Sequence, residues 1–415
     1  MSNNMTSIFA PCRAASAVLA QQPETKVNET LLALADAIVD RSAELISANA
    51  ADCSRMDPAD ARYDRLLLTE ARVADIAGQI RAVAALPSPL GITLETTVRL
   101  NGMTIRKVTV PFGVIGAIFE ARPNVVFDTF ALCFKAGSAA VLKGGHEAHA
   151  TNTAAIAIIR DVLAAAGLPQ DLALLMPSDH DAAAAMLHAR GEIDLIIPRG
   201  SRRLIDFVRA NATVPVIETG AGVCHTYFHT SGDIATGRDI IFNAKTRRVG
   251  VCNALDCLII DRSRLADLPA ICYHLSERDV TIHADEEAYR ALEGAYPLLE
   301  HATPQDYGRE WLSLNLTVHT VGGLDEALEF IGRHGSQHSE CIIAENPEAV
   351  KTFLAAVDAA CVYANVSTAF TDGGQFGLGA EIGISTQKLH ARGPMALREI
   401  TTYKYLITGS GQTRS

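Results

Sequence analysis

The sequence predicts an α/β protein of two domains, each built on a parallel sheet. From Pro111 onward, short and wholly apolar strands alternate with helices, the pattern of parallel sheets covered on both faces. The chain has 415 residues, more than one hydrophobic core usually supports, and 48% of them are hydrophobic while 20% are charged. We therefore expect two successive α/β units with a boundary near residues 220–230.

The part of the chain before this alternation is predicted to be helical. Residues 13–56 carry apolar side chains at helical spacing, and short turns break the segment up to Pro89 into further helices. Between Thr96 and Val110 polar and apolar residues alternate around Asn101-Gly102, a strong signal for a two-residue hairpin turn. We expect this hairpin to stand away from the main core.

The strands and helices that follow are predicted from their apolar runs. In the first domain, helices are expected at 125–135 and 147–166, and strands at 114–119, 139–142, 172–175, 195–197 and 214–217. In the second domain, strands are expected at 258–260, 316–321 and 341–344. Beyond Pro394, the Tyr-rich segment 401–408 is predicted to be an isolated strand that pairs outside its own domain.

Composition excludes several classes of protein. A net charge of −11 and a single Trp argue against nucleic-acid binding. No apolar run reaches the roughly 18 residues of a membrane span, and the first twenty residues lack the layout of a signal peptide. The nine cysteines form no C-x-x-C pair, and unpaired thiols in a long chain indicate a reducing compartment. These features predict a soluble cytoplasmic protein.

Cys252 is the first candidate for chemistry. It follows a helix-like stretch that contains Lys245, Arg247 and Arg248 and ends at Gly250, and it precedes an apolar strand. Positive charge at such a boundary favours the thiolate, which is the nucleophilic form of cysteine. The alternative is a buried structural cysteine, since free Cys usually behaves as a small hydrophobe. The basic setting favours a nucleophile.

Two glycine-containing turns are candidates for binding a nucleotide, although the G-x-G-x-x-G fingerprint is missing. At 142–145, Gly144 lets the backbone approach a ligand closely, and Lys143 can bond ribose or phosphate oxygens. At 198–204, Gly200 and Ser201 would lie at a helix N-terminus, a natural anion site flanked by arginines. Because both turns follow strands of one sheet, together they predict a nucleotide at that edge.

The segment Glu120-Ala-Arg-Pro-Asn124 lies between a predicted strand and a predicted helix. Asn124 is either an N-terminal cap of that helix or a side-chain amide that donates to a developing oxyanion. Arg122 beside it can grip a carboxylate or phosphate with two hydrogen bonds.

Two other segments have the composition of possible ligand sites. His334 and His338 are spaced as metal ligands on a helix, but Gly335 and Ser336 make a continuing helix doubtful, so we predict no metal site. The Gly-rich run 371–383 carries interleaved apolar residues and is expected to line a ligand cleft.

Several of these motifs, in this order and with these spacings, resemble the gamma-glutamyl phosphate reductases, a family of the aldehyde dehydrogenase superfamily. The resemblance spans roughly residues 15 to 410 and rests on 110–116, 120–124, 142–145, 243–246, 251–254, 334–340 and 370–383. It implies an aldehyde dehydrogenase-like fold and a homodimer or higher homo-oligomer. The implied domains are a cofactor-binding domain (1–225 with 356–395), a catalytic domain (226–355) and a small oligomerisation flap (97–110 with 396–410).

The resemblance also implies a reaction, the NADPH-dependent reduction of L-glutamate 5-phosphate to L-glutamate 5-semialdehyde and phosphate in proline biosynthesis. Cys252 matches the nucleophile and Asn124 the amide that holds the oxyanion. The cofactor-binding positions implied are Lys143, Gly144, Gly200 and Ser201.

Other roles stay open. Arg122, Lys245 and Arg248 are candidates to hold the carboxylate or phosphate of the substrate. Glu218 stands where hydrolytic aldehyde dehydrogenases keep a general base, but a reductase of an acyl phosphate has no water to activate, so its role is left open. NADH is compatible with the same lysine as NADPH. The alternative function is that of a CoA-dependent acylating aldehyde dehydrogenase with the same thiol chemistry and another acyl donor.

Overall fold

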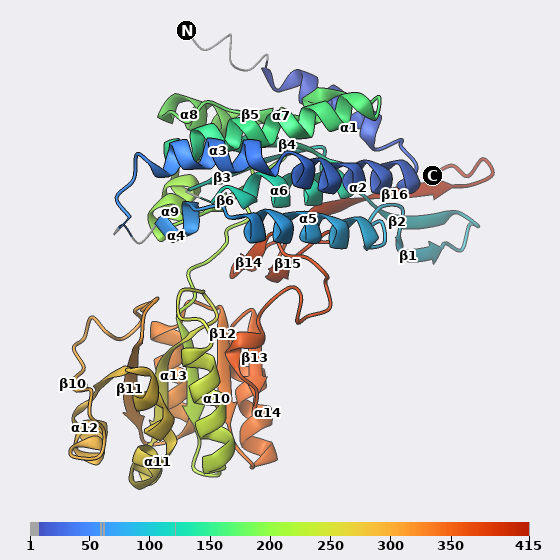
Figure 1. Cartoon of the computed structure of the whole chain (residues 1–415). Helices are drawn as coiled ribbons and strands as arrows, with labels where there is room; N and C mark the ends of the chain where they lie inside the picture. The colour runs from blue at the N-terminus through green and yellow to red at the C-terminus, as the bar shows by residue number, and fades with distance from the viewer. Residues whose placement is uncertain (1–7, 59, 61–62, 121, 415) are drawn as a thin grey trace. The chain divides into compact units, whose positions relative to one another are not determined.

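The computed structural model describes residues 8–58, 60, 63–120 and 122–414, and the chain divides into two compact units (Figure 1). Unit 1 consists of Met1–Glu218, Leu378–Gly383 and Met395–Ser415, and unit 2 of Thr219–Gly377 and Ile384–Pro394. The division of the chain into cofactor-binding and catalytic domains stays a prediction.

The core of unit 1 is a parallel sheet with the strand order β5-β4-β3-β6. Its strands are β3 (Val114–Phe119), β4 (Ala139–Lys143), β5 (Ala173–Leu175) and β6 (Leu195–Arg199). Every residue of β3 is buried, as expected for a central strand covered on both faces. The apolar runs predicted at these four positions are confirmed as strands.

Helices pack around this sheet. They are α1 (Ala10–Leu19), α2 (Glu24–Asp40), α3 (Ser42–Cys53), α4 (Tyr63–Leu66), α5 (Glu70–Ala85), α6 (Asn124–Lys135), α7 (His149–Ala165), α8 (His180–His188) and α9 (Arg202–Asn211), with the 3-10 turns η2 (His146–Ala148) and η3 (Gln170–Leu172). Helix α6 packs against β3 and β4, α7 packs against β5, and α2 packs against α5 and α7 (Figure 1).

The prediction of a strand at 214–217 is wrong. This segment meets the sheet only at a single bridge between Val216 and Ile196. Pro215 at its centre has no N–H to donate to a ladder, and the N–H groups of Thr213 and Val214 both point to the carbonyl of Leu187.

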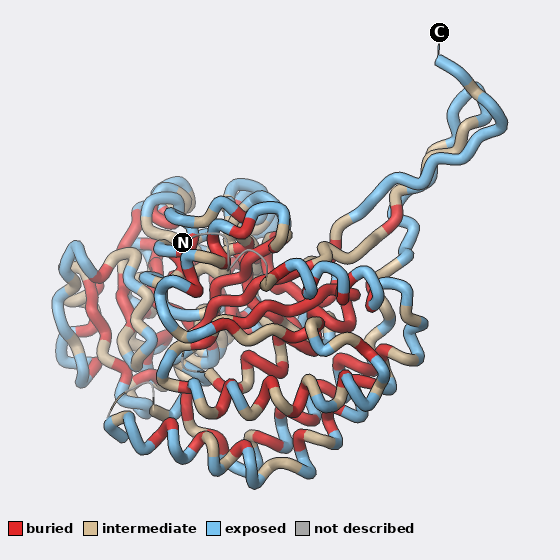
Figure 2. Tube along the Cα trace, turned by 90° about the horizontal axis from the view of Figure 1, so that it is seen from above, coloured by how far each residue is buried: buried red, intermediate tan, exposed pale blue. Residues whose placement is uncertain are grey.

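An antiparallel sheet with the order β1-β2-β16 carries the predicted hairpin. Strands β1 (Thr93–Val98) and β2 (Thr104–Pro111) flank the turn at Gly102, which has a φ of +84°. Strand β16 (Thr401–Thr408) pairs along the whole of β2. Beyond Thr402 the residues of β16 are exposed, as Figure 2 shows beside the C label. An oligomerisation role for this sheet stays a prediction.

Unit 2 is built on a second parallel sheet, with the order β10-β9-β11-β8-β7-β12-β13. Its strands are β7 (Cys224–Phe228), β8 (Leu255–Asp261), β9 (Thr281–Ala284), β10 (Leu299–His301), β11 (Asn315–Val321), β12 (Ser339–Ile343) and β13 (Cys361–Ala364). The prediction of two parallel-sheet units is therefore confirmed.

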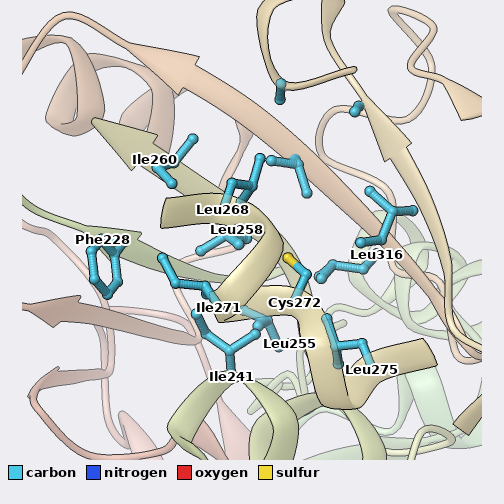
Figure 3. Packing of buried hydrophobic residues seen from close by; sticks show 14 of the residues in the cluster. Phe228, Ile241, Leu255, Leu258, Ile260, Leu268, Ile271, Cys272, Leu275 and Leu316 are labelled. Atoms are coloured by element: carbon cyan, nitrogen blue, oxygen red, sulfur yellow. The ribbon is translucent and has the colours of Figure 1, made fainter. Parts of the chain in front are cut away.

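The helices of unit 2 cover both faces of its sheet. They are α10 (Ile234–Thr246), α11 (Leu268–Cys272), α12 (Glu286–Leu292), α13 (Leu324–His334) and α14 (Pro347–Ala356), with the 3-10 turns η4 (Arg262–Asp267), η5 (Tyr273–Arg278) and η6 (Thr368–Phe370). On β8, Leu258 and Ile260 pack toward α10 and α11 (Figure 3), whereas Cys257 and Ile259 belong to a second core with α13 and α14. Successive side chains of β8 point to opposite faces of the sheet, so this strand contributes to both cores.

The short strand β14 (Gly383–Ser385) pairs with β15 (Gly393–Met395). Within the described ranges, no helix combines the length and the apolarity that crossing a membrane takes.

Candidate active site

Cys252 lies in the loop between α10 and β8 of unit 2. Helix α10 ends at Thr246, four residues before the predicted end at Gly250, and turns lead from there to Leu255. All nine cysteines are free; Cys252 is partly exposed, whereas the other eight are buried. Cys252 is therefore the thiol most open to a reactant.

Hydrogen bonds tie this loop to residues 368–371. The buried side chain of Asn253 donates to the carbonyl oxygens of Ala369 at 3.3 Å and Thr371 at 2.9 Å. In return, Thr368 Oγ1 donates to the carbonyl oxygen of Asn253 at 2.9 Å. These bonds hold the backbone directly after Cys252 in one position.

Gly222 and Cys224 contact the backbone of Cys252 itself. A Cβ added to Gly222 would lie 1.5 Å from the carbonyl oxygen of Cys252, so only glycine fits there. Cys224 Sγ donates to the same oxygen at 3.2 Å, and burial raises the pKa of this thiol well above its ordinary value. The sequence did not single out Cys224, because only the pairing of β7 with β8 brings it to Cys252.

Polar side chains continue behind Cys224 as a buried network. His338 Nδ1 lies 3.9 Å from Cys224 Sγ and 2.8 Å from Ser339 Oγ. Ser339 Oγ and Thr371 Oγ1 are 2.6 Å apart, and Thr371 Oγ1 is 2.7 Å from the hydroxyl of Tyr363. Burial lowers the pKa of His338 to about 4, so its ring is neutral at pH 7.

His334 and His338, which have the spacing of a metal pair, do not share a helical turn. Helix α13 ends at His334, and His338 belongs to the buried network described above. The next acidic residue, Glu340, is paired with His225: it accepts the backbone N–H of His225 at 2.9 Å and lies 2.9 Å from the ring Nδ1. Across the residues that the structure describes, no group of three His, Cys, Asp or Glu side chains is arranged to hold a metal ion.

Lys245 points into the interior of unit 2. Its side chain has no exposed surface, and Nζ donates to the carbonyl of Leu255 at 2.9 Å and lies 4.0 Å from Asp256 Oδ1. Burial lowers the pKa of Lys245 to about 8 and raises that of Asp256 to about 7. Because its side chain is buried and bonded to Leu255, Lys245 presents no exposed surface to a substrate in this structure. Arg248 is exposed.

Asn124 is the first residue of α6 in unit 1, and it does not cap the helix. The N-cap position is taken by Pro123, and no side-chain cap is formed. Instead, Asn124 Nδ2 donates to Asp128 Oδ2 at 2.7 Å, one helical turn further on. The capping interpretation is therefore wrong, and the amide interpretation stays a prediction.

The turn at Gly200 and Ser201, which is predicted to bind an anion, is bonded to the carboxylate of Glu120. Glu120 accepts the backbone N–H of Ser201 at 2.7 Å and the Ser201 hydroxyl at 2.9 Å. A Cβ added to Gly200 would lie 2.6 Å from Glu120 Oε2, so a larger residue there would displace the Glu120 side chain. A negative group at the N-terminus of α9 is what the helix dipole favours, so the turn has the expected chemistry and a cofactor phosphate there would replace Glu120.

The other cofactor-binding candidates lie at the same edge of the unit 1 sheet. Strand β3 is paired with both neighbours in parallel, Ile118 opposite Lys143 and Phe119 opposite Arg199, so the three strands end side by side. Burial lowers the pKa of Lys143, partly opposed by nearby acids. A Cβ added to Gly144 would lie 2.2 Å from Asn152 Nδ2, so a larger residue there would force the Asn152 side chain to move.

Arg122 and Glu218 complete the set of predicted residues. Arg122 is partly buried, and its carbonyl accepts the N–H of Val125 at the start of α6; its neighbour Ala121 lies outside the described residues. Glu218 Oε2 lies 3.5 Å from Arg209 Nη1, an ion pair that gives this carboxylate a structural partner. The structure thus gathers Asn124, Lys143, Gly144, Gly200 and Ser201 at one edge of unit 1, whereas Cys252, Lys245 and Arg248 belong to unit 2.

Sequence reasoning missed Asp128 and Asn253. Asp128 follows Asn124 by four residues in a predicted helix, a spacing at which side chains meet, so it was open to prediction. The bonds of Asn253 run to residues 116 and 118 positions further on, and no local signal announces such partners.

Comparison with known proteins identifies related sequences. The model of the aldehyde dehydrogenase family matches residues 3–275. The chain is 56% identical to a gamma-glutamyl phosphate reductase of Bacteroides thetaiotaomicron and 57% identical to one of Pelodictyon phaeoclathratiforme, in each case over 100% of both chains.

Solved structures give the same result. The crystal structure of a gamma-glutamyl phosphate reductase from Thermotoga maritima superposes with a TM-score of 0.95 at 36% identity, covering 100% of both chains. An acetylating aldehyde dehydrogenase from Geobacillus thermoglucosidasius has a TM-score of 0.70 at 16% identity, with 100% of this chain and 98% of that chain covered. At that identity the second match shows a shared fold only.

Proposed function

The chain belongs to the gamma-glutamyl phosphate reductases of the aldehyde dehydrogenase family, and from this we propose that it reduces L-glutamate 5-phosphate to L-glutamate 5-semialdehyde and phosphate, a step of proline biosynthesis. The observation that carries the mechanism is the partly exposed thiol of Cys252, the only one of nine that is not buried, in a loop anchored by Asn253.

Cys252 is the nucleophile of this mechanism. Its thiolate attacks the acyl-phosphate carbonyl carbon, a C–S bond forms, and the bond from carbon to the phosphate oxygen breaks. Phosphate is a good leaving group, so its departure needs no strong acid. The Asn124 amide and the backbone N–H of Cys252 donate to the oxyanion that develops during the attack.

The reductant is a nicotinamide dinucleotide, which the family uses, and we assign NADPH. When bound, it would supply the hydride that reduces the thioester carbon. The C–S bond to Cys252 then breaks, which releases the semialdehyde and restores the thiolate. The residues at the carboxyl edge of the unit 1 sheet fit such a ligand. Lys143 provides a cation, and Gly144 lets the backbone come close to the ligand. Gly200 and Ser201 lie at the N-terminus of α9, where a phosphate can bind. The N–H and hydroxyl of Ser201 become available to phosphate when Glu120 gives way.

The charged ends of the substrate need cationic partners. Arg122 is assigned to the substrate carboxylate or phosphate because a guanidinium binds such groups with two parallel bonds, and Arg248, which is exposed, is a second contact. For Lys245, buried against Leu255 and Asp256, the proposed role is support of the Cys252 loop from within.

The protein is further proposed to act in the cytoplasm as a homo-oligomer. Nine free cysteines suit a reducing compartment. The sheet of β1, β2 and β16 and the turn of its hairpin expose large apolar side chains, which favour association between copies; they are Leu94, Val98, Leu100, Tyr403, Tyr405, Leu406 and Ile407. The mass of the full chain in solution, measured by light scattering, tests this assignment.

The deciding experiment runs the reaction backwards. Initial rates of semialdehyde oxidation are measured with phosphate or CoA as acyl acceptor, and with NADP⁺ or NAD⁺. Dependence on phosphate and preference for NADP⁺ are expected, whereas dependence on CoA would identify an acylating aldehyde dehydrogenase.

Two variants test the covalent step. Cys252→Ala should abolish turnover while leaving cofactor binding intact, and retained turnover would refute the nucleophile. Cys272→Ala is the matched control, because Cys272 lies inside the hydrophobic core of unit 2 (Figure 3) and should leave turnover unchanged.

A further inference from the structure

Asp128 is a carboxylate at the candidate site that the mechanism above does not use. It lies on α6 one turn after Asn124, and its Oδ2 accepts the Asn124 Nδ2 hydrogen at 2.7 Å. Residues four apart on a helix lie on one face, so the backbone of α6 itself brings the two side chains together. Because this contact depends on one helix only, it is built into the local structure.

Keeping the Asp128 carboxylate buried in this position costs free energy. Its other oxygen, Oδ1, is buried and has no hydrogen-bond partner among the described side and main chains. Burial raises the pKa of Asp128 to about 6, against the opposing effects of the Asn124 hydrogen bond and of Arg199. A buried acceptor without a partner destabilises the fold, so stability alone does not explain a carboxylate here.

The hydrogen-bonding chemistry of Asp128 and Asn124 gives a better explanation for a carboxylate at position 128. An ionised carboxylate only accepts hydrogen bonds, so it admits the NH₂ side of the Asn124 amide and excludes the C=O side. The amide has two hydrogens at a fixed angle to each other; when Asp128 accepts one, the direction of the second is set as well. That second N–H is the one which the proposed mechanism directs at the oxyanion.

We propose that Asp128 is a positioning residue that fixes the orientation of the Asn124 amide for oxyanion stabilisation. The inference rests on the proposed function, since it matters only if Asn124 is the oxyanion donor. Without Asp128 the amide rotates and presents its carbonyl part of the time, and a donor that is misplaced in the transition state loses its effect.

A double-mutant cycle tests this role. Phosphate release in the first turnover is measured for Asp128→Ala, Asn124→Ala and the double variant, together with KM for the acyl phosphate and Kd for the cofactor. Asn124→Ala should slow release by about a hundredfold, as for an oxyanion donor, and Asp128→Ala by about tenfold, as for a misplaced one. KM and Kd should stay within about twofold of the unaltered protein. The double variant should match Asn124→Ala, because Asp128 acts only through that amide.

The outcomes separate the two ideas. If Asn124→Ala retains full activity, the proposed role of Asn124 fails; if it loses activity while Asp128→Ala keeps its rate, only the inference fails. An equal loss on adding Asp128→Ala to Asn124→Ala would show an independent role for Asp128 and overturn the inference.

Two further variants guard against a structural explanation. Asp128→Asn keeps the size and accepts a hydrogen bond but also tolerates a flipped Asn124, so it should fold and show a partial loss; an unchanged rate would contradict the proposal. Asp194→Asn alters another carboxylate of unit 1, bonded to Arg13 and to the N–H of Val114 at the opposite end of β3. It should lower the unfolding temperature without slowing phosphate release.

Discussion

Replacing Asn253 with alanine should loosen the loop that carries Cys252. The change removes two hydrogen bonds from the buried amide, to the carbonyls of Ala369 and Thr371. Each contributes about 1 kcal/mol net, and a buried carbonyl left without a donor costs a further 1–3 kcal/mol or so. Asn253 Oδ1 is itself buried without a partner among the described residues, and its removal offsets part of the loss. We expect a net destabilisation of roughly 2–3 kcal/mol.

Two measurements follow this variant. Urea denaturation gives the free energy of unfolding, and the rate of Cys252 alkylation by iodoacetamide reports the position of the thiol. Both should change for Asn253→Ala, because the same bonds stabilise unit 2 and hold the loop.

Asn365→Ala is the matched control for this experiment. The Asn365 amide bonds the N–H and C=O of Ala344, and its φ of +56° makes alanine unfavourable there. It should lose a comparable free energy of unfolding without altering the alkylation rate. If Asn253→Ala loses less than about 0.5 kcal/mol, or if both variants alter alkylation equally, the proposed anchoring of the loop is wrong.

Three more perturbations have outcomes that the structure specifies. Iodoacetamide should modify one thiol in the folded protein and nine after unfolding, and Cys252→Ser should reduce the folded count to none, since the other cysteines are buried; labelling of a second folded thiol would contradict this burial pattern. Glu120→Gln removes a negative charge from the Ser201 turn, so NADPH, followed by its fluorescence, should bind up to about tenfold more tightly; weaker binding would mean that Glu120 contacts the cofactor. Burial raises the pKa of Asp128 from 3.8 to about 6, so the stabilisation that its bound proton provides is full below pH 3.8 and is lost as the pH rises through 6. The stability of Asp128→Asn relative to the unaltered protein should therefore rise by about 1.4 kcal/mol between about pH 5 and about pH 8 in urea titrations, and a flat difference would show that this carboxyl is not buried as described.

The elements that the sequence predicted well are those whose residues all face the same kind of environment. Strand β3 is buried at every position, so its apolar run was sufficient evidence for a central strand. The segment 214–217 is equally apolar, yet it forms only one bridge, because Pro215 interrupts the ladder. An apolar pattern in the sequence predicts burial, but it does not show whether each residue has the backbone N–H that strand pairing requires.

At the candidate site, too, some features follow from neighbouring residues in the sequence and others only from the tertiary structure. The sequence alone determined that a thiol stands at the boundary of an apolar strand and that helices begin close to Ser201 and Asn124, because these are properties of neighbouring residues. Only the tertiary structure decided that Lys245 turns inward to Leu255 and that Glu120 occupies the Ser201 turn. Contacts between distant segments depend on how strands pair and where each side chain is directed, and neither quantity is contained in a local pattern of residues.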